Sequence, residues 1–166
     1  SLTLCAYIYP TTPTVDTEGV AVGEQALLSK WDADKKKGYG LFINKEGELE
    51  FRLGNGRGKV ESFSTRKPMM RKIWYKVMVS FDASTGKGLI CQIPYLTATN
   101  GGHGPSMLHP RSDTEAERKF TAKNGAARMH ESPFMMAASC KSSECGRQVF
   151  DGHYSHLEQP WDIPQH

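Results

Sequence analysis

The stretch RKIWYKVMVSFDASTGKGLICQIPYL, residues 71–96, carries the clearest fold signal in the sequence. Apolar residues alternate with mixed ones from Trp74 to Phe81, and a period of two is that of a β-strand. The turn residues 82–88 then lead into a second apolar run that ends at Tyr95. We therefore predict a hairpin of two strands, and the core-facing residues of its first strand are Tyr75, Val77, Val79 and Phe81.

The same period recurs along most of the chain. The run LTLCAYIY (2–9) is predicted as a strand buried on both faces, and it is ended by Pro10. Four more strand-like runs follow: QALLSKW (25–31), YGLFIN (39–44), ELEFRLG (48–54) and KVESFST (59–65). The segment NKEG (44–47) joins the second and third of these runs through a predicted tight turn, in which Gly47 takes a positive φ. Two closing strands are predicted within PFMMAAS (133–139) and RQVFDGHYSHLEQP (147–160). The fold class is all-β, an antiparallel two-sheet sandwich of the jelly-roll type.

The organisation is that of one domain over residues 1–166, which we expect to be a segment of a longer chain. Residues 97–132 are polar and rich in Gly, Asn and His, so we expect a long insertion loop there. The single helical signal lies within it, in SDTEAERKF (112–120), where Ser112 or Asp113 could cap a short helix.

Composition excludes several partners. With 38% hydrophobic residues, 23% charged residues and a net charge of +3, the chain favours neither nucleic acid nor an anionic membrane. No apolar run approaches the roughly 18 residues of a membrane-spanning helix, and the pattern of a secretory signal is missing, so we expect a cytoplasmic protein.

The four cysteines are too few to indicate a disulfide framework in a chain of this length. We interpret Cys5, Cys91, Cys140 and Cys145 as free thiols, which usually behave as small buried hydrophobes. A local disulfide between Cys140 and Cys145 is the alternative.

Several landmarks resemble concanavalin A-like, laminin G-like jelly-roll domains, in the order in which those domains carry them. They include LTLCAYIYPTTP at 2–13, GYGLFINKEGELEFRLGNG at 38–56, WYKVMVSFDASTGKG at 74–88 and FDGHYSHLEQP at 150–160. The combination of YPTTP (9–13), LLSKWDA (27–33) and STRKPMMRKIWYKVMVSFDASTGKG (64–88) most resembles the jelly-roll segment of the large subunit of bacterial N,N-dimethylformamidases.

That resemblance implies an accessory or assembly module of an amide hydrolase. Enzymes of this family hydrolyse a small amide at an iron centre held by tyrosine and carboxylate side chains, and that centre belongs to other domains. No catalytic residue and no cofactor is therefore expected in this segment, and the expected partners are other domains or subunits of the parent enzyme. The insertion at 97–132 matches no landmark of the family.

The alternative is a glycan-binding, lectin-like domain that uses calcium. Asp32, Asp34 and Asp82 lie in turns and supply the hard oxygen ligands that calcium prefers. The competing interpretation is that Asp82 accepts backbone N–H groups of its own turn. Arg52 and Trp161 are the candidate ligand-binding residues, and Trp31 and Trp74 are further aromatic side chains, although Trp74 is expected at an inter-sheet or rim position.

Catalysis by this segment itself has weaker support. Glu48 and Glu50 share one strand face, as a glycosidase pair requires, but the neighbouring positions of the laminarinase-like pattern hold Leu49 and Leu53. We interpret the two carboxylates as part of a solvated strand face. His103 and His109, with Asp113 and Glu115, are a loose set of residues from which a metal site could be assembled, but loops of this composition usually bind no metal.

Overall fold

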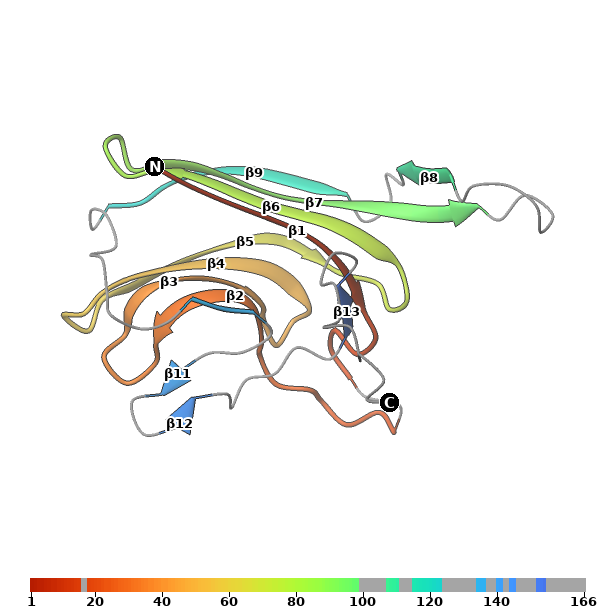
Figure 1. The fold of residues 1–166 in the computed structure, drawn as a ribbon, viewed down its shortest axis with the longest axis horizontal. Helices are drawn as coiled ribbons and strands as arrows, with labels where there is room; N and C mark the ends of the chain where they lie inside the picture. The colour runs from red at the N-terminus through yellow and green to blue at the C-terminus, as the bar shows by residue number, and fades with distance from the viewer. Residues whose placement is uncertain are drawn as a thin grey trace, which may run out of the picture.

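The structure is a computed structural model, and it describes residues 1–15, 18–98, 107–110, 115–123, 134–136, 140–141, 144–145 and 152–154. These residues form two β-sheets packed face to face, as Figure 1 shows. Every regular element among them is a strand, which confirms the all-β sandwich predicted from the alternating sequence pattern. Within this part of the chain there is no helix that could cross a membrane.

The first sheet has the order β13-β1-β6-β7-β8, with β9 also paired to β7. Its central hairpin is the one predicted from residues 71–96, and Trp74 pairs with Tyr95 at one end and Asp82 with Lys87 at the other. The bounds of its strands are β1 (Leu2–Pro10), β6 (Trp74–Asp82), β7 (Lys87–Ala98), β8 (Met107–Pro110), β9 (Ala116–Thr121) and β13 (Gly152–Tyr154).

The second sheet has the order β12-β11-β2-β3-β4-β5, with β10 also paired to β2. Its pairs are antiparallel except that β11 runs parallel to β2. In Figure 1, β3 and β4 arch so that their concave side faces away from the first sheet. The bounds are β2 (Gln25–Asp32), β3 (Lys37–Ile43), β4 (Glu48–Asn55), β5 (Val60–Pro68), β10 (Met135–Met136), β11 (Cys140–Lys141) and β12 (Glu144–Cys145).

The core lies between the sheets and contains the residues that the period of two assigns to it. On β6 the buried residues alternate strictly, so the predicted inward set is confirmed. The second sheet contributes side chains from three neighbouring strands, among them Leu41, Leu49 and Phe51, all with no exposed surface. Phe120 joins the cluster from β9 and stacks on Phe63 with a ring-centre distance of 4.2 Å.

Turn chemistry fixes the hairpin register of the second sheet. Gly47 has φ of 78° and donates its N–H to the carbonyl of Asn44 at 2.8 Å. The side-chain oxygen of Asn44 accepts the N–H groups of Glu46 and Glu48 at 3.1 and 2.9 Å. The predicted turn at NKEG is therefore confirmed, and it holds β3 and β4 in register.

Three expectations about individual segments were wrong. Residues 116–121 form the strand β9 and not a helix. This strand pairs with β7, and the alternation of a strand turns Ala116, Arg118 and Phe120 inward. Strand β1 is buried on one face only, since Leu4 and Ile8 are buried but Cys5 is exposed. Of the two positions expected for Trp74, the inter-sheet one is wrong, because Trp74 lies on the outward side of β6, at the first residue of the strand.

The segment 97–132 is more than a connection. It contains β8 and β9, which pair with successive parts of β7. Strands β11 and β12 place Cys140 and Cys145 directly opposite one another, a register that is compatible with the local-disulfide alternative.

Candidate functional site

A cluster of charged side chains occupies the concave side of the second sheet, centred on Arg52. The guanidinium of Arg52 forms ion pairs with Glu50 on its own strand and with Glu24, which precedes β2. The same group stacks over the ring of Phe42 at 4.7 Å from the ring centre, and Phe42 meets Trp31 edge-on at 6.3 Å. Arg52, the residue selected from the sequence, is therefore held on three sides.

Polar neighbours extend this cluster along β4. The side-chain amide of Asn44 donates to Glu48 and Glu50, both at 3.3 Å. The hydroxyl of Ser64 on β5 donates to Glu48 at 2.7 Å. Glu50 is only 9% exposed, so the expectation of a solvated carboxylate was wrong for this residue.

The electrostatic balance of the cluster keeps the arginine charged. Burial alone would lower the pKa of Arg52, but the hydrogen bonds and negative charges of Glu24 and Glu50 outweigh it, and the pKa is raised. Both carboxylates are in turn engaged by the guanidinium. This arrangement fastens the segment directly before β2 to β4 and leaves the guanidinium with two carboxylate partners already in place.

Two of the three calcium candidates, Asp32 and Asp82, accept hydrogen bonds within their own turns, and the third, Asp34, donates its backbone N–H to Asp32. Oδ1 of Asp32 accepts the backbone N–H groups of Asp34 and Lys35 at 3.1 and 2.9 Å. Asp82 accepts the backbone N–H and the hydroxyl of Ser84 at 3.0 and 2.8 Å and the hydroxyl of Thr85 at 2.9 Å. The interpretation of Asp82 as a turn-stabilising residue thus agrees with its observed contacts.

Those contacts also change the acidity of Asp82. Hydrogen bonds from the Ser84 hydroxyl, the Ser84 backbone and the Thr85 hydroxyl lower the pKa of Asp82 from 3.8 to about 2. They favour the charged carboxylate because each donor points at an ionised oxygen.

In the part of the chain that the structure describes, no group of three or more His, Cys, Asp or Glu side chains could hold a metal ion. His103, Asp113 and Trp161 lie outside the described residues, and only the backbone of His109 is described.

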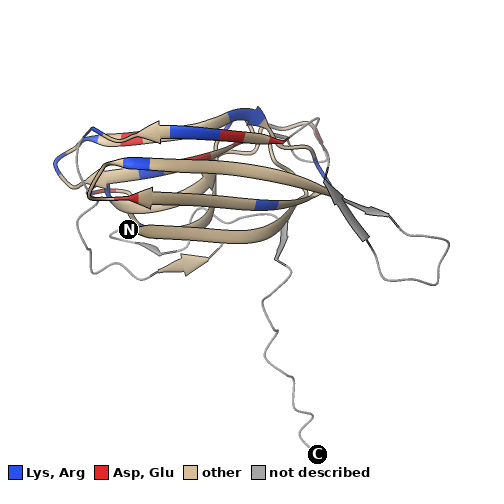
Figure 2. Ribbon diagram, turned by 90° about the horizontal axis from the view of Figure 1, so that it is seen from above, with Lys and Arg blue, Asp and Glu red and all other residues tan. Residues whose placement is uncertain are grey.

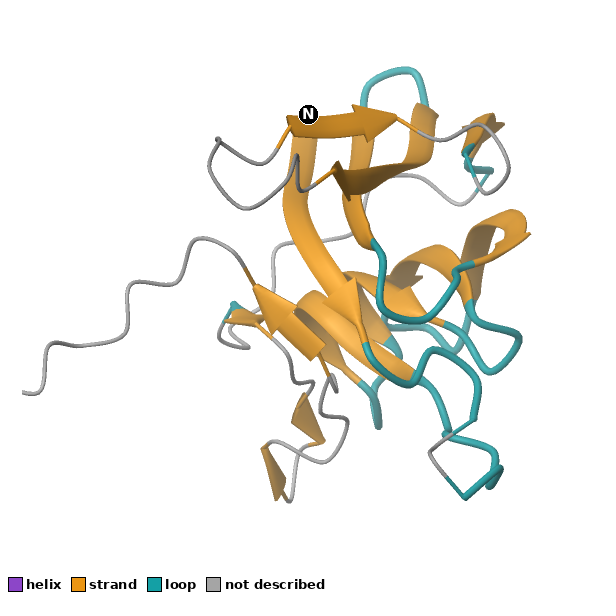
Figure 3. Cartoon of the chain, turned by 90° about the vertical axis from the view of Figure 1, so that its right-hand side faces the viewer, coloured by secondary structure: helices purple, strands orange, loops and turns teal. Residues whose placement is uncertain are grey.

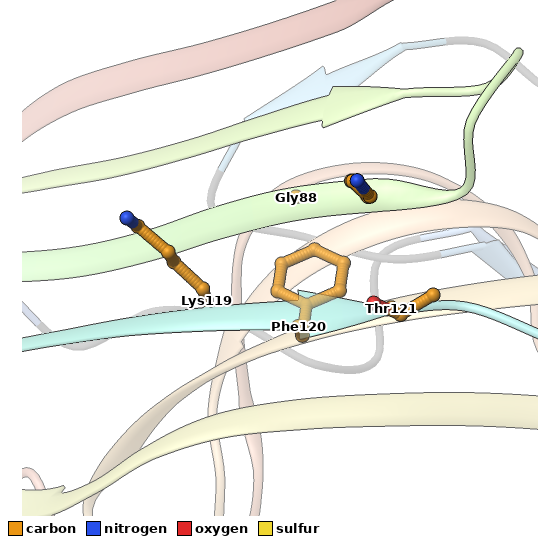
Figure 4. Close-up of a pocket in the computed structure, with 5 residues that line it drawn as sticks. Gly88, Lys119, Phe120 and Thr121 are labelled. Atoms are coloured by element: carbon orange, nitrogen blue, oxygen red, sulfur yellow. The ribbon is translucent and has the colours of Figure 1, made fainter.

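A shallow pocket lies where β7 meets β9, and Figure 4 shows it. It is lined by Lys87, Gly88, Lys119, Phe120 and Thr121. The ring of Phe120 lies so close to Gly88 that a Cβ atom at position 88 would overlap it. Sequence reasoning missed this pocket because it placed residues 112–120 on a helix, which breaks the pairing of Gly88 with Phe120.

Two aromatic pairs mark a second surface, on the outward side of the first sheet. Tyr9 contacts Trp74 with ring centres 5.2 Å apart, and Tyr7 contacts Tyr95 at 6.1 Å. All four side chains are half-buried. The period of two in the sequence indicated the side of β6 on which Trp74 lies. The grouping of the four rings depends on the order β1-β6-β7 in the sheet, which the sequence pattern does not give.

Comparison with known proteins gives two relatives of the same kind. The chain is 26% identical over 149 residues to the N,N-dimethylformamidase beta subunit of Alcaligenes sp, a match that covers 90% of this chain and 18% of that protein. It is 35% identical over 60 residues to the N,N-dimethylformamidase beta subunit of Paracoccus aminophilus, covering 36% of this chain and 8% of that protein. No family model matches the sequence.

The chain spans less than a fifth of the length of the curated relatives it matches. The resemblance to dimethylformamidases seen in the sequence is confirmed by these matches. The assignment to the concanavalin A-like, laminin G-like class stays a prediction.

Proposed function

We propose that this chain is a non-catalytic assembly module of an N,N-dimethylformamidase-like amide hydrolase. The observation that carries the proposal is the similarity to the beta subunit of such an enzyme over 90% of this chain. Because that match takes up 18% of the relative's length, the chemistry is assigned to other parts of the enzyme, together with the iron that the family resemblance implies. The module contributes a rigid sandwich on which those parts and other subunits pack.

The site geometry supports this role. The charged cluster around Arg52 is paired within itself, so its carboxylates serve the structure of the concave face. The carboxylates of Asp32 and Asp82 accept hydrogen bonds from N–H and O–H groups of their own turns. A module that supplies contact surface needs neither a free acid nor a free base.

The experiment is to purify the protein that carries this sequence from its native source and determine its intact mass, its co-purifying subunits and its activity. We expect a polypeptide several times longer than 166 residues, which releases dimethylamine from N,N-dimethylformamide. An independent protein of this length without amide-hydrolase partners would overturn the proposal.

A second candidate is a glycan-binding domain, and the aromatic pairs on the outward side of the first sheet favour it. Tyr and Trp rings offer flat apolar surface with a polar edge, which suits the stacking of sugar rings. A glycan array probed with and without calcium tests this candidate. Binding that is lost when Trp74 is replaced by Ala, but kept when Trp31 is replaced by Phe, is its expected result.

A further inference from the structure

The outward side of the first sheet is apolar where a solvated sheet would be polar. Residues that face each other across an antiparallel pair share one side of the sheet, so Tyr7 pairs with Lys76, Cys5 with Met78, and Trp74 with Tyr95 on the side opposite the core. We call this surface the outer face, and its central members are Cys5, Tyr7, Trp74, Met78, Ile93 and Tyr95. No strand among the described residues lies over it, because β8 and β13 extend the sheet at its edges (Figure 1).

Few charges interrupt the outer face. Strand β1 carries no charged residue, β6 carries Lys76 and Asp82, and β7 carries Lys87. Asp82 and Lys87 are opposite each other in the register at the hairpin end, so Lys76 is the one charged residue in the middle of these three strands. On the neighbouring strand β9, Glu117 and Lys119 lie on the same side of the sheet, opposite Cys91 and Leu89. Figure 2 looks onto this side and shows long uncharged stretches of these strands, with a denser group of charges on β9. One-sided antiparallel sheets normally carry polar residues outward, so this composition is that of a contact surface.

The chemistry of the outer face defines what it can bind. Trp and Tyr side chains supply large contact area at a low cost in conformational entropy. Lys76 lies between Tyr7 and Ile93 in the register of the three strands. A partner must therefore present apolar side chains together with a carboxylate that meets Lys76, because burying an ammonium group without a counter-charge is costly.

We infer that the outer face is the surface by which this module docks on the remainder of its own polypeptide. The inference rests on the proposed function and names the contact through which it works. In the Alcaligenes relative more than four-fifths of the chain lies outside the matching segment, and a covalently linked partner acts at high effective concentration. A second copy is the weaker occupant, because a two-fold contact centred on this face would bring Lys76 against Lys76.

Cys5 reports directly on this contact. It belongs to the outer face and is exposed on the surface of the sandwich, whereas Cys91 on the same side is buried. The test measures iodoacetamide alkylation of Cys5 by peptide mapping in the intact native protein and in the same protein unfolded in urea. We expect Cys5 to react at least about tenfold more slowly in the native protein, since the docked remainder excludes the reagent.

Two variants of the intact protein sharpen the test. Ile93→Asp places a new charge in the apolar part of the outer face and should restore fast alkylation of Cys5. Lys76→Glu should do the same, and it keeps the test valid if the first variant does not fold. Ser62→Asp is the matched control, because Ser62 is exposed on β5 and pairs with Arg52 on the opposite outer surface.

The outcomes separate this inference from the proposed function. If the native protein is a long amide hydrolase but Cys5 reacts at the unfolded rate, the docking inference is overturned and the proposed function stands. Protection of Cys5 that appears only when a glycan is added also overturns it, in favour of a sugar-binding face. Native protection that both outer-face variants abolish, and Ser62→Asp leaves intact, supports docking.

Discussion

Gly38 shows at the scale of one residue how tightly the second sheet is built. It adopts φ of 109°, a conformation that residues with a Cβ atom rarely take, and a Cβ atom there would overlap the carbonyl oxygen of Lys30 on β2. We predict that Gly38→Ala lowers the free energy of unfolding by at least about 2 kcal/mol, because strain and overlap both act. Urea unfolding followed by circular dichroism measures this loss.

Gly58→Ala is the matched control for Gly38→Ala. Gly58 also has positive φ, 78°, but nothing lies within 4 Å of a Cβ atom built on it. Its cost is therefore confined to the backbone strain of roughly 1–2 kcal/mol. Equal losses for the two variants would contradict the account, since the crowding at Gly38 would then have no effect.

Asp82 gives a residue-scale prediction about pH. Its pKa in the folded protein, about 2, is below its ordinary value of 3.8, so the carboxylate stabilises the fold above about pH 4. That stabilisation is lost as the pH falls toward 2, because the carboxyl then protonates in both states. Asp82→Asn should lower the urea midpoint at pH 6, and the difference from the parent protein should shrink as the pH approaches 2.5. A difference that is constant over this range would show that charge plays no part in the turn.

At the scale of the elements, a polar contact buried at one end of the core joins the two sheets. The hydroxyl of Thr65 on β5 donates to the side-chain oxygen of Gln92 on β7 at 2.7 Å, and the Gln92 amide donates to the carbonyl of Lys67 at 3.0 Å. Arg66, which lies between Thr65 and Lys67, has φ of 57°. It lies in a β-bulge, where the register between β5 and β4 shifts between Glu48 and Glu50. This bulge turns the strand so that its hydroxyl and carbonyl meet β7.

We predict that Gln92→Leu costs about 1–3 kcal/mol of stability, because the hydroxyl of Thr65 and the carbonyl of Lys67 lose a buried partner. The double variant Thr65→Val with Gln92→Leu should cost less than the sum of the single variants. Denaturant unfolding of the four proteins gives the coupling free energy of the pair. Strict additivity would mean that the contact does not link the sheets.

The assignment of strand faces makes a further prediction at this scale. Phe51 on β4 has no exposed surface and contacts the rings of Phe81 and Phe120 at 6.1 and 5.8 Å. Phe51→Ala should therefore cost about 3–5 kcal/mol through loss of burial and cavity formation. Ser80→Ala on the outward side of β6 should fall within about 0.5 kcal/mol of the parent protein, as surface substitutions usually do. A cost near zero for Phe51→Ala would show that the inward face of β4 is assigned wrongly.

The elements also show which parts of the structure the sequence can predict. Strict alternation on β6 and the NKEG turn depend on neighbours in the chain, and both were predicted correctly. Strand β9 was missed because AERKF also suits a helix, and its pairing with β7 depends on residues about 30 positions away. The ion pair of Arg52 with Glu24 joins segments separated by β2 and β3, and no local pattern in the sequence predicts it.

At the scale of the whole molecule, the two outward surfaces of the sandwich differ in kind. The concave side of the second sheet carries charges that pair with one another around Arg52. The outer face of the first sheet is apolar and contains the aromatic pairs of Tyr7 and Trp74. Since a single core of residues from both sheets holds these surfaces together, a contact made through one sheet is supported rigidly by the other.

That shared core predicts that the sandwich unfolds as one unit. The fluorescence of Trp31 on β2 and that of Trp74 on β6 report on different sheets. The double variant Trp74→Phe with Trp161→Phe isolates the emission of Trp31, and the double variant Trp31→Phe with Trp161→Phe isolates that of Trp74. In each variant the fluorescence transition in urea should coincide with the loss of far-ultraviolet circular dichroism, because Tyr75, Val77, Leu41 and Phe51 lie in one continuous cluster. If the emission of Trp74 instead changed at a lower urea concentration than the circular dichroism of the same variant, the first sheet would unfold independently. The core would then not couple the outer face to the rest of the molecule.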